Sequence, residues 1–100
     1  MKVIADICVV PLGVGVSLSR YRAACQDIFE QAGLEPRVHG YGSNVEGEFD
    51  VVMAALEACH ERLHELGVPR VSTNLRLGTR SDRAQTLDDK LESLARERGR

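Results

Sequence analysis

The pattern of hydrophobic and polar residues predicts a buried strand at the start of the chain and a half-buried strand later. Residues 3–10 are apolar except at Asp6, which is typical of a strand covered on both faces. Pro11 is expected to end this strand. Between Val71 and Thr79 apolar residues alternate with polar ones, which predicts a strand with one buried face.

A helix is predicted between these strands, because apolar residues recur at helical spacing from Tyr21 to Ala32. Ser17 or Ser19 is expected to cap the start of this helix, and Gly33 is expected to close it.

Two short strands are predicted next, at about 36–41 and 44–48, joined at Gly42 and Ser43 as a hairpin. The elements after the hairpin are a helix of about residues 49–66 that stops at Gly67, the alternating strand, and a charged helix of about residues 82–98. The order β-α-β-β-α-β with an extra C-terminal helix predicts an α+β, ferredoxin-like sandwich in which two helices cover one face of a four-stranded antiparallel sheet.

The other face of the predicted sheet would be open unless a partner covers it. The first strand still carries Ile4, Cys8 and Val10 on that face, so we expect this chain to self-associate as a dimer or tetramer through it.

Composition narrows the class of protein. One hundred residues favour a single domain, 1–100, and 43% hydrophobic with 28% charged residues is typical of a globular protein. A net charge of −2 with scattered basic residues and few aromatic ones does not favour a nucleic-acid partner. No apolar run is long enough to cross a membrane, and the first residues resemble a strand more than a signal peptide, so a cytoplasmic location is expected.

The three cysteines, Cys8, Cys25 and Cys59, are odd in number, share no metal-binding spacing and lie in apolar patterns. They are interpreted as reduced residues that pack in the interior.

One motif suggests a metal site. His60, Glu61 and His64 form H-E-x-x-H, which on a helix can bind zinc and supply a general base. At helical spacing both histidines lie away from the apolar stripe of their helix, whereas a catalytic zinc needs a dry cleft and a third protein ligand. We therefore expect the two histidines to lie on a solvated face, with no metal or cofactor and no hydrolase activity.

A second group of polar residues is predicted to converge on the open face of the sheet. Alternation places Asn44, Glu46 and Glu48 on that face, with Asp6 on the first strand. Ser72, Asn74 and Arg76 follow the same alternation, and Tyr41 could add an aromatic ring. Such a set suits a small cationic or amide-bearing heterocycle. The alternative is that the two glutamates only favour the start of the helix that follows them.

Three segments of the chain resemble those of a known family. "PLGVGVSLSRY", "GYGSNVEGE" and "RVSTNLRLGTRSDR" are similar, in order and separation, to the signature segments of the YkoF-type thiamine-binding proteins, and the resemblance extends to Lys90 and Ser93. The resemblance implies a ferredoxin-like fold, binding of thiamine or its hydroxymethylpyrimidine part, and dimers that assemble into tetramers.

The resemblance also implies roles for individual residues. Ser19, Ser43 and Glu46 match motif positions, and Arg80 and Asp82 match an R-x-D pair. Together with the polar pattern, the candidate ligand-binding residues are Ser19, Ser43, Asn44, Glu46 and Arg80.

The chain departs from the family pattern where Val14 and Ser43 replace threonines and where Gly78 replaces an acid; Ser43 keeps the hydroxyl, whereas Val14 loses one. The sequence thus favours a non-catalytic binding protein for a thiamine-like ligand at or near a subunit interface. The alternative is a structural or regulatory oligomer in which Glu46 and its neighbours only form contacts between subunits.

Overall fold

The computed structural model describes residues 1–99. In that range the elements are β1 (Lys2–Leu12), α1 (Ser19–Gln31), β2 (Arg37–His39), β3 (Gly42–Glu48), α2 (Phe49–Glu65), β4 (Arg70–Gly78) and α3 (Leu87–Glu97).

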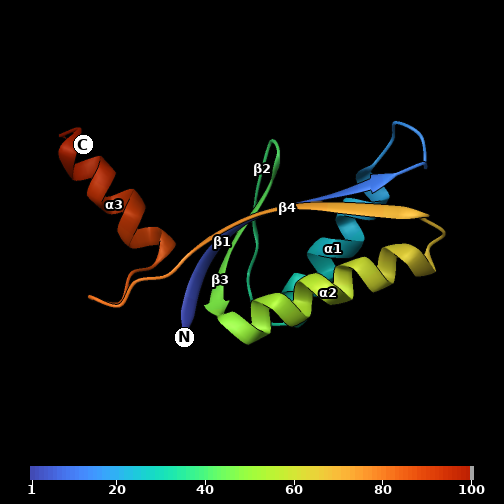
Figure 1. The fold of residues 1–100 in the computed structure, drawn as a ribbon. Coiled ribbons are helices and arrows are strands. Elements are labelled where there is room, and N and C mark those ends of the chain that lie inside the picture. The colour runs from blue at the N-terminus through green and yellow to red at the C-terminus, as the bar shows by residue number, and fades with distance from the viewer. Residues whose placement is uncertain (100) are drawn as a thin grey trace.

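The four strands form one antiparallel sheet in the order β2-β3-β1-β4. Helices α1 and α2 lie side by side on one face of this sheet, and α3 stands at the far end of the molecule (Figure 1). This arrangement confirms the predicted ferredoxin-like sandwich with an extra C-terminal helix.

Alternation along β1 explains how the two faces differ. Val3, Ala5 and Ile7 point to the helices and are at most 3% exposed. Removing such side chains from water is the main stabilisation of the sandwich. The core against which they pack also contains Tyr21, Cys25, Phe29, Leu34, Val45, Val52, Ala55, Leu56, Cys59, Leu63 and Val68.

Two boundaries in the strands differ from the predictions. Pro11 lies inside β1 and pairs with Val71, because β1 has lost its β3 neighbour beyond Ile7 and its free edge needs no N–H donor there. The hairpin turns at residues 40–41 and not at Gly42 and Ser43, which are already the first residues of β3.

Two helix starts also differ. Leu18 occupies the N-cap position of α1 with no side-chain cap, so neither Ser17 nor Ser19 plays the expected role. The third helix begins at Leu87 and not near residue 82, since Thr86 and Asp89 form a reciprocal capping box that fixes its first turn.

Helix α3 is an amphipathic arm and not part of the sandwich. None of its residues is buried, and Leu91 and Leu94 are 59% and 56% exposed. The arm gives the molecule extents of 46 × 28 × 20 Å. Within residues 1–99, the helices are too short or too polar to span a bilayer.

Candidate functional site

A groove of about 750 Å³ lies where the open face of the sheet meets the segment that leads into α3. Its walls come from all four strands, from residues 33–35 and from the segment between Thr79 and Lys90. Its volume is within the range of about 300–1,000 Å³ that is usual for sites that bind small organic molecules.

The register of the strands places polar side chains in one row across the groove. Asp6 is opposite Asn44 on β3 and opposite Arg76 on β4, and all three line the groove. Because directly opposed residues share a face, the expected convergence on the open side of the sheet is confirmed for this row.

Glu46 lies two residues beyond Asn44 on the same face of β3 and lines the same groove. Its Oε2 accepts a hydrogen bond of 2.8 Å from the backbone N–H of Leu87, the first residue of α3. Glu46 therefore ties the arm to the sheet, and the helix whose start it favours is α3, not α2 as the sequence alternative supposed. Arg37 adds a second tie through an ion pair of 3.0 Å with Asp88.

A histidine from the neighbouring strand engages the carboxylate of Asp6. His39 Nε2 lies 2.6 Å from Asp6 Oδ1, and His39 Nδ1 accepts the backbone N–H of Tyr41 at 3.2 Å. Since Nδ1 accepts, the proton of the neutral ring is on Nε2, which donates to Asp6. The contact reaches across β3 at Gly42, the residue opposite His39.

Arg80 is bound by an acidic neighbour in the segment before α3. Its Nε donates to Asp82 Oδ1 at 2.8 Å, and its Nη2 donates to Oδ2 of the same carboxylate. The hydrogen bond from the guanidinium holds the pKa of Asp82 at about 2, below its usual 3.8. Arg80 thus lines the groove with its charge largely neutralised.

Replacement of Arg80 by Gln is expected to return the pKa of Asp82 to the ordinary range of about 4. The ion pair is complete above the ordinary pKa of 3.8 and is lost as the pH falls towards 2, because the depressed pKa belongs to the folded state. A carboxyl ¹³C NMR titration measures both values, with Arg98→Gln as the control. A midpoint near 4 already in the parent protein would contradict the pair.

Two of the five candidate residues do not line the groove. Ser43 points to the helices, is 2% exposed and accepts a hydrogen bond of 2.7 Å from Gln26 Nε2. The cavity beside it measures about 30 Å³, the space of one water molecule and not of a heterocycle. Ser19 is the exposed first residue of α1 and lines neither space. Alternation from Val45 could have revealed the orientation of Ser43.

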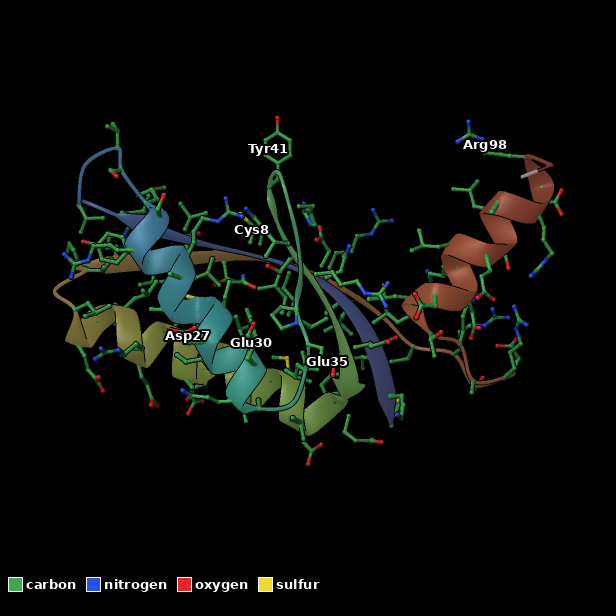
Figure 2. All side chains as sticks on the ribbon, turned by 180° about the vertical axis from the view of Figure 1, so that it is seen from behind. Cys8, Asp27, Glu30, Glu35, Tyr41 and Arg98 are labelled. Carbon is green, nitrogen blue, oxygen red and sulfur yellow. The ribbon has the colours of Figure 1, made fainter. Side chains whose placement is uncertain are left out.

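Tyr41 also lies elsewhere. It is 88% exposed at the tip of the β2–β3 hairpin and points away from the body of the molecule (Figure 2). The aromatic ring expected in the site is therefore absent from the groove.

The histidines of the H-E-x-x-H sequence have structural partners. His60 is half-buried, with Nε2 2.6 Å from Thr73 Oγ1 on β4, so its expected place on a solvated face was wrong. The apolar stripe predicts only the centre of the buried face of α2. Strand β4 also contacts the side of α2 next to that stripe, where His60 lies. His64 donates from Nδ1 to the carbonyl of Val68 at 2.8 Å and so secures the end of α2. Across residues 1–99, no three His, Cys, Asp or Glu side chains are grouped so as to hold a metal ion.

Two cysteines have the expected packing role. Cys25 and Cys59 are buried between α1 and α2 at 4% and 0% exposure. A hydrogen bond with Cys25, together with burial, raises the pKa of the Cys59 thiol, which stays protonated.

Several residues of the groove were not predicted as site residues. Arg37 reaches the groove from the open face through the alternation of β2, and this signal was present in the sequence. Lys2, Arg83 and Lys90 come from three separate segments, and only the folded chain brings them to one groove.

Comparison with known proteins supports a thiamine-related family. The family described as "Thiamine-binding protein" matches residues 5–95. The UPF0045 protein sll0230 of Synechocystis sp. is 55% identical over 94 residues, which are 94% of this chain and 78% of that protein. The UPF0045 protein ECM15 of Eremothecium gossypii is 39% identical and covers 92% of this chain and 89% of its own.

Solved structures share the fold. The crystal structure of MJ1052 of Methanocaldococcus jannaschii matches with a TM-score of 0.87 at 29% identity, over 94% of this chain and 96% of that one. TM0486 of Thermotoga maritima, a proposed thiamine biosynthesis or salvage protein, matches with a TM-score of 0.79 over 94% of this chain and 99% of its own. At 22% identity the second likeness supports the fold alone.

Proposed function

The chain belongs to the thiamine-binding protein family, and from this we propose that it binds thiamine or a related hydroxymethylpyrimidine-type ligand in the groove, without catalysing a reaction. The observation that carries the proposal is the placement of Asn44 and Glu46 on one face of β3, both lining the groove. Arg80, which also lines the groove, completes the candidate set.

The chemistry of an aminopyrimidine matches these two side chains. Side chains two residues apart on a strand are about 7 Å apart, which leaves room for a six-membered ring between them. Glu46 uses Oε2 for Leu87, and its second oxygen can accept the exocyclic amine. Asn44, which makes no side-chain hydrogen bond within residues 1–99, can donate to a ring nitrogen.

Calorimetric titration with thiamine and with hydroxymethylpyrimidine tests the proposal. Glu46→Gln is expected to weaken binding by about 10- to 100-fold, since a charge-assisted hydrogen bond contributes about 1.5–3 kcal/mol. The amide oxygen of the new Gln can still accept from Leu87, so the arm stays attached. Glu48→Gln is the matched control, because Glu48 shares the strand and the face but lies outside the groove.

If neither thiamine nor hydroxymethylpyrimidine produces heat at high protein concentration, the proposal is contradicted. The alternative function, a structural or regulatory oligomer, is favoured by the exposed Leu91 and Leu94 of α3, the arm that Glu46 holds through its bond with Leu87. Under that alternative, the Glu46→Ala variant should lose its assembly on sizing chromatography. If the protein instead binds the ligand through Glu46, the variant should lose ligand binding while the assembly persists.

In this proposal the chain functions as a dimer or tetramer. Two features support self-association: the half-buried Cys8 and Val10 on the open face, and the exposed leucines of α3. The groove includes Asp6, two residues before Cys8 on β1, and Lys90, the neighbour of Leu91, so the ligand would lie at or near the interface between subunits. We place the protein in the cytoplasm, where its three free thiols stay reduced.

A further inference from the structure

The groove concentrates positive charge in a chain that is acidic as a whole. The net charge of the chain is −2. Six basic side chains line the groove against three acidic ones. The contrast between groove and chain indicates a ligand that carries negative charge.

Ion pairs neutralise only part of this charge. Arg37 pairs with Asp88, and Arg80 pairs with Asp82. The remaining four, Lys2, Arg76, Arg83 and Lys90, form no ion pair with a carboxylate of residues 1–99. They come from β1, β4, the segment before α3, and α3 itself, so they border the groove from separate elements.

Two of the three acids of the groove, Asp6 and Glu46, are engaged by other groups; the third acid is Glu35. Arg76 is directly opposite Asp6 in the sheet, yet the Asp6 carboxylate contacts His39 at 2.6 Å. Glu46 accepts the N–H of Leu87. Charge pairing inside the groove therefore leaves Arg76 available to an incoming ligand.

We propose that the groove binds a phosphate monoester of the thiamine-like ligand in preference to the unphosphorylated form, with Arg76 contacting the phosphate. This rests on the proposed function and names the form of its ligand. With the pyrimidine at Asn44 and Glu46, the rest of the molecule extends towards the basic side chains. A thiazolium cation alone is repelled there, whereas a phosphate dianion forms charge-assisted hydrogen bonds with guanidinium and ammonium groups.

Calorimetry with thiamine, thiamine monophosphate and inorganic phosphate, each at low and at high salt, tests this inference. Thiamine monophosphate is expected to bind at least about tenfold more tightly than thiamine, and the advantage should shrink at high salt because all four basic groups are exposed. Arg76→Gln should remove most of the advantage without weakening thiamine. Arg70→Gln is the matched control, since Arg70 is on the open face of β4 but outside the groove.

Each result decides a different question. Equal binding of the two forms, or tighter binding of thiamine, overturns the phosphate inference and leaves the proposed function standing. Inorganic phosphate that binds as tightly as the monoester overturns the inference in favour of a simple anion site. Failure of all three compounds to bind overturns the inference and the proposed function together.

Discussion

Gly42→Ala is expected to lower the free energy of unfolding by about 3 kcal/mol, the upper part of the range for overpacked positions. A Cβ at this position would lie 2.3 Å from the carbonyl oxygen of Ile7 and 3.3 Å from the Cα of Cys8. Both atoms belong to the backbone of β1, an inner strand that β3 and β4 hold on either side. Relief of the clash therefore requires the end of the β1–β3 ladder to separate.

Thermal unfolding measures the effect. At about 4–8 °C per kcal/mol for a domain of this size, the midpoint should fall by more than about 10 °C. Gly40→Ala is the matched control in the same hairpin, because a Cβ there meets no atom within 4 Å and its φ is not in the left-handed region. That variant should stay within about 0.5 kcal/mol of the parent. Equal stability of the two variants would contradict the close approach of the strands.

The periodic spacing of hydrophobic residues along the sequence predicted most of the fold. Alternation on β1 and β4 and helical spacing on α1 and α2 each identify the face that meets the core, and these four elements form most of the sandwich. The residues at which strands and helices begin and end depend on interactions that hydrophobic spacing does not reveal. Pro11 continues β1 because a neighbouring strand has ended, and α3 starts late because Thr86 finds a partner in Asp89.

The site was predictable only where a strand fixes the direction of a side chain. Asn44 and Glu46 follow from the alternation of β3, and the groove contains both. Ser43 and Ser19 were proposed by resemblance to motif positions. Ser43 is close to Glu46 in sequence but lies on the opposite face of β3, and Ser19 lies at the start of α1. The positions of Arg83 and Lys90 in the groove depend on the path of the chain after β4, and no periodic pattern in the sequence predicts that path.

Helix α3 is the element that a single chain explains least well. An isolated helix of 11 residues is marginal in water, yet this one presents Leu91 and Leu94 to solvent. Its attachments to the body, Glu46 to Leu87 and Arg37 to Asp88, are polar and lie at its first turn. Under the self-association proposed above, a second copy of the chain, which has its own uncovered sheet face, would supply the apolar surface that the leucines lack.

The double variant Leu91→Ala, Leu94→Ala is therefore expected to convert the proposed oligomer into a monomer of 11.0 kDa. A buried leucine contributes about 1–2 kcal/mol more than alanine, so two from each of two subunits contribute at least about 4 kcal/mol, or about a thousandfold or more in the dissociation constant. Alanine keeps the helix propensity, so the change removes contact and not the helix. Sedimentation velocity at several concentrations measures the assembly.

Glu92→Ala with Glu97→Ala is the matched control on the polar side of α3, and it should leave the assembly intact. A parent protein that sediments at 11.0 kDa at every concentration would contradict self-association itself. A double leucine variant that keeps the parent's assembly would contradict the role of α3 alone and would move the interface to the part of the open face around Cys8 and Val10. The two results test different claims. A monomeric parent protein would show that no second copy binds, whereas an unchanged leucine variant would show only that α3 does not form the interface.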